Sequence, residues 1–493
     1  MTGLDGTHVR VLVVGAGFAG LGAAIRMRRS GEDSFLVLEQ ADEVGGTWRD
    51  NTYPGVACDV PSHLYSFSFA PKSDWKRRFA GGEEIRQYLR SCAEEVAEHI
   101  RCGTRLLSAE WRQGPRSWKV TTNAGTITAG ALVLASGRFS RPALPTLPGL
   151  VTFPGRVCHT ARWDPRIVPE GARIGVVGSG ASAVQAVPAL VGRGAQVTVF
   201  QRSAPWILPK HDAAYGTAEQ SVFAADDDVR RDHRAEIFDE LDSAFEARVL
   251  GSTAHTELRR RAQDHLRRSI PAGPVREALT PADEVGCRRV LLSDDFYPAV
   301  ASGAAAVEPS APLAVQGRAV RAASGRTYEL DALVFATGFD ASRPAIASSI
   351  VGRGGETLAE HWADGMTSYG STSVSGFPNC IILGGPHAAL GHNSAVAMLE
   401  AQFDQLLSAL ASVPAGGVWE VRAEAEKAYT AMIDERAAST AWVSPGCRSW
   451  YRHGGTGRVT LLWPGTAQEY RRRFGVFHPE QHTIEQVALG SSC

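Results

Sequence analysis

The sequence VRVLVVGAGFAG, residues Val9–Gly20, joins an apolar, β-branched run directly to a glycine-rich turn. Such a run is typical of a buried parallel strand. The helix-forming segment Leu21–Arg29 follows, and then a second apolar run, Phe35–Leu38, which is followed by Glu39. A strand, glycine turn, helix and strand, with an acid about 20 residues after the glycines, predict a βαβ unit that binds a dinucleotide. The glycines of the G-x-G-x-x-G turn are Gly15, Gly17 and Gly20.

A second unit of the same kind begins with the apolar run Arg173–Val177 and continues to the run Gln196–Phe200. Its turn has the variant spacing G-x-G-x-x-A, which is also a dinucleotide fingerprint. The residues of this turn are Gly178, Gly180 and Ala183. The chain therefore carries two dinucleotide-binding units, and they are its only visible duplication.

The residues after the second strand of each unit differ in charge. Glu39 can accept hydrogen bonds from both hydroxyls of an adenosine ribose, and it would repel a 2′-phosphate. The second unit has Arg202 and Ser203 at the same place, and a guanidinium pairs with a 2′-phosphate. The first site therefore suits FAD or NAD, and the second suits NADPH, with Lys210 and Arg288 as further phosphate candidates.

Two long patterns carry a family resemblance. The stretch FPGRVCHTARWD between the loops fits F-x-G-x-x-x-H-x-x-x-W-D, and the stretch Gly45–Asp59 fits [AG]-G-x-W-x-x-x-x-[FY]-P-[GM]-x-x-x-D at every fixed position. Both resemble signatures of the flavin-dependent (type I) Baeyer–Villiger monooxygenases, which are class B flavoprotein monooxygenases. The resemblance runs from about Val9 to Phe474. The fixed residues of the first pattern are Phe153, Gly155, His159, Trp163 and Asp164.

The resemblance implies FAD in the first unit and NADPH in the second. Gly45 and Gly46 would permit a close backbone approach beneath a bulky ring system. The short segments 135–137 and 336–338 resemble strand-end motifs that link the two domains of such flavoproteins. The residues expected to hold the two cofactors are Gly15, Gly17, Gly20, Glu39, Gly46, Thr47, Trp48, Asp59, Tyr65, Gly178, Gly180, Ala183, Arg202, Ser203, Arg288, Thr337 and Gly338.

The family's reaction requires a permanent cation near the flavin. Its members form a C4a-peroxyflavin that attacks a ketone carbonyl, so a peroxide anion and then an oxyanion need stabilisation. Arginine suits this role because it does not lose its proton when buried. By the family pattern G-x-K-R, Arg289 would be catalytic and Arg288 would replace the NADPH-binding lysine. Asp59 would fix Arg289, and Trp450 would belong to a mobile loop that closes over nicotinamide and substrate.

Two further features have weaker interpretations. His159 has no metal partner spaced around it, so we expect a structural hydrogen bond in the interdomain linker and no metal site. The helical run Ala395–Gln402 follows a glycine-rich turn, and its N-terminus could face the flavin pyrimidine.

Composition limits the class of protein. The 493 residues include 44% hydrophobic and 21% charged residues, with a net charge of −1, which favours neither nucleic acid nor an anionic membrane as a partner. No secretory leader or membrane span is visible, so a cytoplasmic protein is expected. The eight cysteines are scattered without a C-x-x-C pair, which argues against zinc and predicts reduced thiols.

The predicted fold is α/β, with two Rossmann-like dinucleotide-binding domains and a helical insertion in the NADP domain. The FAD domain is discontinuous, from residues 1–145 and 365–493, and the NADP domain is formed by residues 146–210 and 281–364. Residues 211–280 are charged and helical in pattern and form the insertion. Its basic cluster Arg259–Arg261 is expected on a solvated helix face.

The predicted reaction inserts one oxygen of O2 beside a ketone carbonyl, giving an ester or lactone. One alternative is a flavin monooxygenase that oxygenates sulfur or nitrogen of soft nucleophiles. The less favoured alternative is a pyridine-nucleotide flavoprotein reductase, because no C-x-x-C pair is present. The identity of the small-molecule ketone and the oligomeric state are left open by the sequence.

Overall fold

The computed structural model describes residues 3–486. Within them the largest sheet has eight strands in the order β17-β4-β5-β6-β1-β2-β3, with β18 also paired to β6. Strands β1, β2, β6 and β18 run parallel, as a doubly wound sheet requires, whereas β4, β5 and β6 form an antiparallel meander. The strands are β1 Thr7–Val14, β2 Phe35–Leu38, β3 Ile100–Arg101, β4 Leu106–Arg112, β5 Ser117–Thr122, β6 Gly125–Leu134, β17 Ile350–Val351 and β18 Cys380–Ile382.

The second sheet is parallel throughout, in the order β12-β9-β8-β16-β7. Its strands are β7 Arg156–His159, β8 Arg173–Val177, β9 Gln196–Phe200, β12 Ala305–Glu308 and β16 Ala332–Phe335. The remaining strands form small sheets: β10 Ile207–Leu208 with β11 Leu291–Leu292, β13 Pro312–Gln316 with β14 Ala319–Ala322 and β15 Thr327–Glu329, and β19 Val418–Val421 with β20 His482–Glu485. The two predicted βαβ units are therefore confirmed, one in each large sheet.

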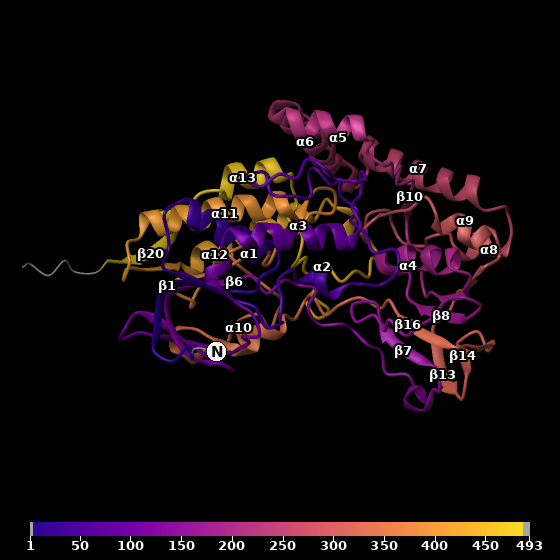
Figure 1. Cartoon of the computed structure of the whole chain (residues 1–493), viewed down its shortest axis with the longest axis horizontal. Coiled ribbons are helices and arrows are strands. Elements are labelled where there is room, and N and C mark those ends of the chain that lie inside the picture. The colour runs from indigo at the N-terminus through magenta and orange to yellow at the C-terminus, as the bar shows by residue number, and fades with distance from the viewer. Residues whose placement is uncertain (1–2, 487–493) are drawn as a thin grey trace, which may run out of the picture.

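Helices cover both sheets. Each sheet with its helices forms one part of the molecule, and the two parts lie at the left and right of Figure 1. The first sheet is covered by α1 Phe18–Arg29, α3 Gly82–Glu94 and α11 Ala395–Ser412, and the second by α4 Ala181–Gly192 and α9 Phe296–Ala301. The other helices of these parts are α2 Thr47–Asp50, α10 Leu358–His361, α12 Ala423–Ala437 and α13 Ala467–Phe474.

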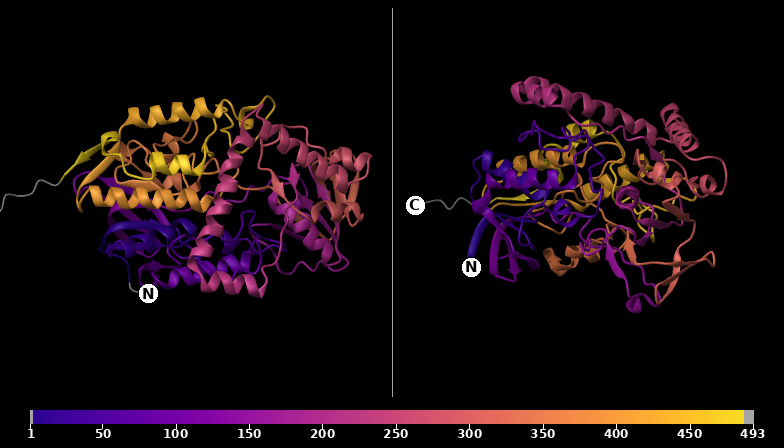
Figure 2. Two further views of the ribbon diagram at one scale, coloured as in Figure 1. Left: turned by 90° about the horizontal axis from the view of Figure 1, so that it is seen from above. Right: turned by 45° about the vertical axis from the view of Figure 1, so that its right-hand side comes forward.

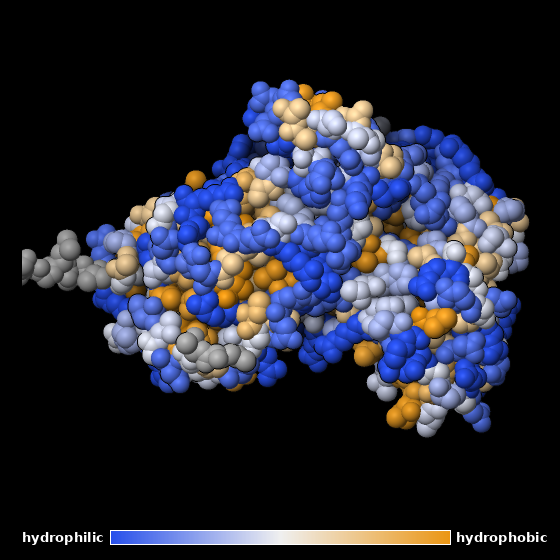
Figure 3. Space-filling view, viewed as in Figure 1, coloured by the Kyte–Doolittle hydropathy of each residue, from blue (hydrophilic) through white to orange (hydrophobic). Residues whose placement is uncertain are grey.

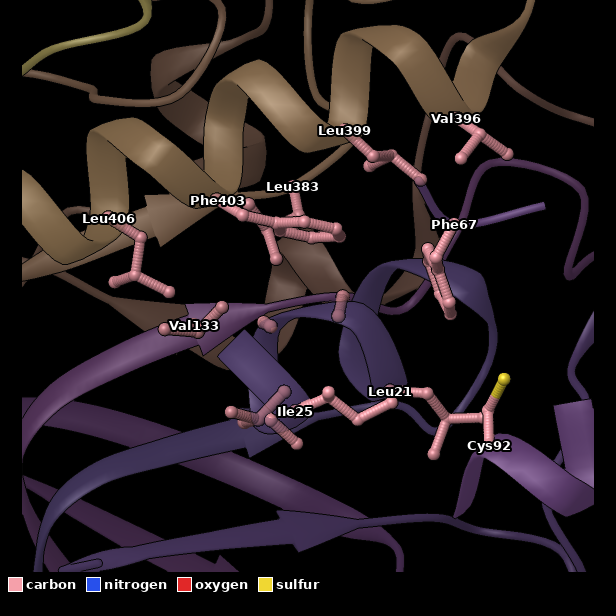
Figure 4. Close-up of a cluster of buried hydrophobic side chains, with 14 of the residues drawn as sticks. Leu21, Ile25, Phe67, Cys92, Val133, Leu383, Val396, Leu399, Phe403 and Leu406 are labelled. Carbon is pink, nitrogen blue, oxygen red and sulfur yellow. The ribbon is translucent and has the colours of Figure 1, made fainter. Parts of the chain in front are cut away.

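The main core forms where α11 crosses α1. Leu399 and Phe403 of α11 lie over Leu21 of α1 and Val133 of β6 (Figure 4). The helices approach closely because Gly22 has no side chain: a Cβ there would lie 2.4 Å from the Phe403 ring. This contact joins the first βαβ unit to a segment almost 400 residues later in the chain.

The predicted insertion is helical and consists of α5 Thr217–Ala225, α6 Asp227–Ser243, α7 Thr253–Ser269 and α8 Pro274–Ala278. Figures 1 and 2 show α5, α6 and α7 along one side of the molecule, spanning both parts. Asp242 of α6 accepts hydrogen bonds from the backbone N–H groups of Ala467 and Gln468, at the start of α13. Leu266 of α7 belongs to the core of the second sheet. The insertion is thus attached to both parts of the molecule.

The basic cluster of α7 fits its predicted solvated face. Arg260 is 60% exposed and pairs with Glu257 and Asp264 of the same helix. Arg259 pairs with Glu284 outside it. Acidic neighbours therefore neutralise most of this cluster.

Strand β17 pairs with β4 of the first sheet through residues 350–351. One finding differs from the sequence-based expectations. Cys287 and Cys447 form a disulfide, so the prediction of reduced thiols was wrong for this pair. The pair escaped notice because the fold joins cysteines 160 residues apart, whereas a C-x-x-C search tests only local pairs. Cys493 lies outside the described residues, and the free cysteines among those described are Cys58, Cys92, Cys102, Cys158 and Cys380.

Hydrophilic residues cover most of the face shown in Figure 3, and apolar residues appear there in scattered patches. No helix within residues 3–486 has the length and apolar character needed to cross a bilayer.

Candidate active site

One cavity of about 2090 Å³ extends from the first glycine turn to the second. It lies beyond the carboxyl ends of the parallel strands, where open α/β sheets bind their ligands. The predicted site residues that line it are Gly15, Gly17, Glu39, Gly46, Thr47, Trp48, Asp59, Tyr65, Gly178, Gly180, Arg202, Ser203, Arg288, Arg289, Thr337, Gly338 and Trp450. Residues from both ends of the sequence therefore meet around a single space.

The first glycine turn forms a cradle that fits a pyrophosphate. Gly15 has φ +110°, and a Cβ there would lie 2.4 Å from the carbonyl oxygen of Ala135. Gly20 lies outside the cavity wall and lets α1 approach the turn, since a Cβ there would lie 1.8 Å from the oxygen of Gly15. Helix α1 begins after Gly17 without a side-chain cap, which leaves its first N–H groups free for an anion.

Hydrogen bonds and an ion pair hold the Glu39 carboxylate beside the first turn. It is 4% exposed, and its carboxylate accepts hydrogen bonds from the backbone N–H groups of Ala16 and Ala41, both at 3.0 Å. Arg49 forms a 3.0 Å ion pair with it. Arg49 follows the Gly45-Gly46-Thr47-Trp48 motif directly, but it was not among the predicted site residues.

The second turn repeats the cradle. Gly178 has φ +123°, and a Cβ there would lie 2.3 Å from the oxygen of Ala336. Helix α4 follows Gly180, also without a side-chain cap. Ala183, like Gly20, packs in the core behind the turn. Both turns therefore present uncapped helix N-termini to the same cavity.

The arginine positions around the second turn form a basic edge. Arg202 and Ser203 are exposed at the end of β9. Arg288 donates from Nη1 to the Ser203 Oγ at 2.9 Å and pairs through Nε with Asp283 at 2.8 Å. Lys210, the other phosphate candidate, instead lies 4.8 Å above the ring of Phe79.

Arg289 and Asp59 form an ion pair at the centre of the cavity wall. The Arg289 Nε donates to Asp59 Oδ2 at 2.7 Å, and the two side chains are 30% and 28% exposed. Burial would raise the pKa of Asp59, but the charge and hydrogen bond of Arg289 outweigh burial and lower it. The Asp59 carboxylate in turn raises the pKa of Arg289. The cation and anion are therefore both fully charged at neutral pH.

Comparisons with known proteins agree with this geometry. A family model described as pyridine nucleotide-disulphide oxidoreductase matches residues 12–218. A Baeyer–Villiger monooxygenase of Streptomyces coelicolor is 40% identical, with 94% of this chain and 90% of the relative covered. The chain belongs to the Baeyer–Villiger monooxygenases. A second such enzyme, from Pseudomonas aeruginosa, is 38% identical, with 98% of this chain and 93% of the relative covered.

Solved structures place the whole fold in the same group. An oxidized steroid monooxygenase bound to NADP has a TM-score of 0.84 at 28% identity, covering 98% of this chain and 100% of that chain. A closed crystal structure of cyclohexanone monooxygenase has a TM-score of 0.85 at 25% identity, with the same coverage. The predicted fold class and enzyme class, a flavin monooxygenase of Baeyer–Villiger type, are confirmed.

In this Baeyer–Villiger monooxygenase the Gly45–Asp59 signature joins the two parts. A Cβ at Gly46 would lie 3.1 Å from the Cα of Gly17, so the signature lies directly against the first turn. Tyr53 donates to the side-chain oxygen of Gln185 on α4 at 2.7 Å. Gly55 leaves room for α4, since a Cβ there would lie 2.5 Å from the Gln185 carbonyl oxygen.

Trp48 and Tyr65, both predicted cofactor contacts, lie together in the cavity wall. The Trp48 Nε1 donates to the Tyr65 hydroxyl at 3.3 Å, and their rings meet edge to face at 5.5 Å. The wall beside the first turn is therefore aromatic, which suits a planar ring system.

The linker fingerprint supports the cavity from behind. Phe153 is buried in the core, and Gly155 is confined because a Cβ there would lie 2.2 Å from the oxygen of Asp331. His159 ends the edge strand β7 beside β16, and its Nδ1 accepts a hydrogen bond from the backbone N–H of Ala161 at 3.1 Å. Burial lowers the pKa of His159, so the imidazole is neutral, as a structural role requires.

The last two fingerprint residues stabilise the turn after β7. Trp163 packs against the core of the second sheet. Asp164 accepts hydrogen bonds from the backbone and side chain of Arg166, which lower the pKa of this carboxyl to about 2. The fingerprint thus positions β7 and the Thr337-Gly338 segment that follows its neighbour β16.

Trp450 reaches the linker through a chain of rings. It is 40% exposed, and the centre of its ring lies 5.7 Å from the ring centre of Phe139 and 4.6 Å from that of Tyr451. The ring centres of Phe139 and Phe339 are 5.3 Å apart, and those of Phe339 and His159 are 5.7 Å apart. The loop that carries Trp450 therefore contacts the segments that link the two parts of the molecule.

Two further arginines, the partly buried Arg138 and the buried Arg248, were not predicted from the sequence. Arg138 donates to the carbonyl oxygen of Gly384 at 2.8 Å, and Arg248, in the 3-10 helix Ala244–Arg248, donates to Gly391 at 3.0 Å. Burial lowers the pKa of each to about 10, so both remain cationic at neutral pH. Arg138 follows a strand-end motif that could have indicated it, whereas nothing in the insertion's pattern distinguishes Arg248.

Proposed function

We propose that this chain inserts one oxygen atom of O2 beside the carbonyl carbon of a ketone, giving an ester or lactone, and that NADPH supplies the electrons. The observation that carries the proposal is the Arg289–Asp59 ion pair in the wall of a cavity that joins two dinucleotide cradles. When bound, FAD reduced by NADPH supplies the activated oxygen.

The first cradle would hold FAD. Its uncapped helix N-terminus suits the pyrophosphate, and Glu39 suits the ribose hydroxyls because its carboxylate already faces the turn. Trp48 and Tyr65 offer an aromatic wall to the ring system. Residues 1–145 and 365–493 would form this FAD domain, and strand β17 of the intervening segment adds to its sheet.

The second cradle would hold NADPH. Arg202 and Arg288 both line the cavity at the second turn, and Arg288 donates to the Ser203 hydroxyl, so these groups would hold a 2′-phosphate. Residues 146–210 and 281–364 would form this NADP domain, with residues 211–280 as its insertion. Placing the two coenzymes in one cavity brings electron donor and acceptor together.

Arg289 would stabilise the negative charge that develops on the ketone oxygen. Its charge is permanent, because the Asp59 carboxylate raises its pKa, and its side chain is partly buried in the cavity wall, which strengthens its interaction with an oxyanion. Asp59 holds the guanidinium through Nε, which leaves the Nη groups directed to other partners. Asp59 is thus a positioning residue for Arg289.

Trp450 and Tyr451 would exclude water from the reacting ketone. Both line the cavity, and Tyr451 is buried while Trp450 is partly exposed at the edge. A loop that carries these rings can cover the substrate and limit loss of the activated oxygen as hydrogen peroxide.

The test compares ketone and thioether oxidation in Arg289→Ala and Arg289→Lys. Removing one charge-stabilising group typically costs about 10²–10³ in kcat, so we expect ester formation by Arg289→Ala to fall by that amount, with FAD still bound. Arg289→Lys should recover part of the activity at low pH. Unchanged ester formation by Arg289→Ala would contradict the proposal. Sulfoxidation lost in parallel with ester formation would assign Arg289 to cofactor binding instead.

A further inference from the structure

The disulfide Cys287–Cys447 joins two segments of the active site that the sequence separates by 160 residues. Cys287 directly precedes Arg288 and Arg289, and Cys447 lies three residues before Trp450. Both cysteines are buried, with exposed fractions of 0% and 6%. The covalent bond therefore ties the loop that carries Trp450 to the segment that carries the arginine pair.

Apart from the disulfide, the loop is attached to the rest of the fold mainly in its second half, where Arg458 Nε donates to Asp434 at 3.0 Å and Tyr451 and Val459 pack in a core cluster with Trp442. Within residues 444–460, Cys447 donates from its N–H to Ser444, Thr460 donates to Tyr451, and the Arg452 side chain donates to Cys447 and Gly457. These bonds shape the loop, but they do not attach it to the arginine segment. The disulfide is thus the firmest link between them.

We propose that Cys287 and Cys447 form a thiol–disulfide modification site that determines whether residues 444–459 stay fixed beside Arg289. The reactant is a dithiol reductant. One of its thiolates attacks the Cys447 Sγ, the S–S bond breaks, and Cys287 leaves as a thiolate that takes up a proton. The second thiol of the reductant then attacks the mixed disulfide, which yields a second protein thiol and an oxidised reductant.

The difference in burial between the two cysteines determines which sulfur is attacked first. Cys447 is the less buried of the two, so it is the point of attack when the loop opens locally. Attack at Cys447 makes the fully buried Cys287 the leaving thiolate, which then takes up a proton. Its N–H also donates to Glu284 at 3.0 Å, so the cysteine is held in a defined turn.

Reduction should release the loop without unfolding the protein. The cores of both sheets have no part in this bond, whereas the loop loses its covalent link to the arginine segment. Local opening of the loop would then expose Trp450 and its neighbours more often. The inference goes beyond the proposed oxygen insertion, and it rests on that function only for the effect on catalysis.

The first experiment counts thiols in the FAD-bound protein purified without reductant. The sequence has eight cysteines and the described residues contain one disulfide, so dithiothreitol should raise the number of thiols titrated in the denatured protein by two, to eight. Protein that titrates eight thiols even after treatment with hydrogen peroxide, which would convert two thiols to a disulfide and two waters, would overturn the proposal.

The second experiment follows trypsin cleavage after Arg448, Arg452 and Arg458, all in the loop, without NADPH or ketone. We expect cleavage on the order of tenfold faster in the reduced protein, because the loop opens more often. Equal cleavage of oxidised and reduced protein would overturn the proposal. Since no turnover is needed, failure of the proposed oxygen insertion leaves this result unaffected.

Matched variants separate the disulfide from other thiols. Cys447→Ser and Cys287→Ser should each show the fast cleavage with or without dithiothreitol. Cys102→Ser removes an exposed free cysteine and should keep the full response of the wild-type protein. In the active holoenzyme, reduction should raise the hydrogen peroxide released per NADPH, and a response that survives in Cys447→Ser would contradict the assignment.

Discussion

At the scale of single residues, the Arg289–Asp59 pair combines a fixed position with a fixed charge. The two side chains come from segments 230 residues apart, and their 2.7 Å bond exists only because both sheets face one cavity. Sequence patterns could predict that these residues act together. They did not predict Arg248, a further buried cation, or Arg138, which is partly buried.

Asp59→Asn tests the positioning of Arg289. The amide still accepts a hydrogen bond but removes the counter-charge, so the guanidinium would stay protonated and lose its fixed orientation. A hydrogen bond between charged groups contributes about 1.5–3 kcal/mol, so we expect kcat for the ketone to fall about 10–100-fold. FAD affinity, measured by flavin fluorescence, should stay unchanged. An unaltered kcat would contradict the role given to Asp59.

The same variant gives a pH prediction. The folded pKa of Asp59 is lowered, so the ion pair stabilises the fold above the carboxyl's ordinary pKa of about 3.9. That contribution is lost as pH falls through the lower folded pKa. The difference in Tm between wild type and Asp59→Asn should therefore be constant from about pH 5 to 8 and shrink below about pH 4. A difference that grows on acidification would refute the assigned shift.

Arg202→Ala tests the coenzyme preference. A charge-assisted hydrogen bond contributes about 1.5–3 kcal/mol, so KM for NADPH should rise about 10–100-fold while KM for NADH changes little. Steady-state kinetics with both coenzymes measures this. Arg193→Ala, an exposed arginine paired with Glu170 at the end of α4, is the control. Equal losses with NADPH and NADH would place the 2′-phosphate elsewhere.

At the scale of elements, periodic patterns predicted the strands and helices of both units because each has a continuous apolar face. They did not locate β17, whose two residues are too few to form a pattern and which pairs with β4 through the tertiary fold. The linker fingerprint shows the same limit. Its spacing identified the family, but the structure shows that it supports β7 behind the cavity and that the cavity wall is formed by other residues.

Gly20→Ala tests the closest approach between helix and turn. The added Cβ would lie 1.8 Å from the Gly15 carbonyl oxygen, which is backbone and cannot move aside easily. We expect a loss of stability above about 2 kcal/mol together with weaker FAD binding, measured by thermal unfolding and flavin release. Gly114→Ala, where nothing lies within 4 Å, should have little effect. Equal Tm values for the two variants would contradict this packing.

At the scale of the whole molecule, the fold brings the two cofactor cradles, the arginine segment and the C-terminal loop to one cavity. The pairing of Cys287 with Cys447 belongs to this scale, and no local spacing could predict it. Asp242 of the helical insertion also joins distant segments. Its carboxylate accepts hydrogen bonds from the backbone N–H of Ala467, at the start of α13, and from the side-chain amide of Asn393, in the cavity wall. Such contacts are properties of the assembled chain.

Oxygen-18 incorporation tests the central claim most directly. Purified holoenzyme would be supplied with NADPH, ¹⁸O₂ and a panel of linear, cyclic and aryl ketones, and the products would be analysed by mass spectrometry. We predict an ester or lactone that carries one labelled oxygen for at least one ketone, with one NADPH consumed per product. Hydrogen peroxide formed in equal amount to NADPH with every ketone, and no labelled ester, would contradict the account.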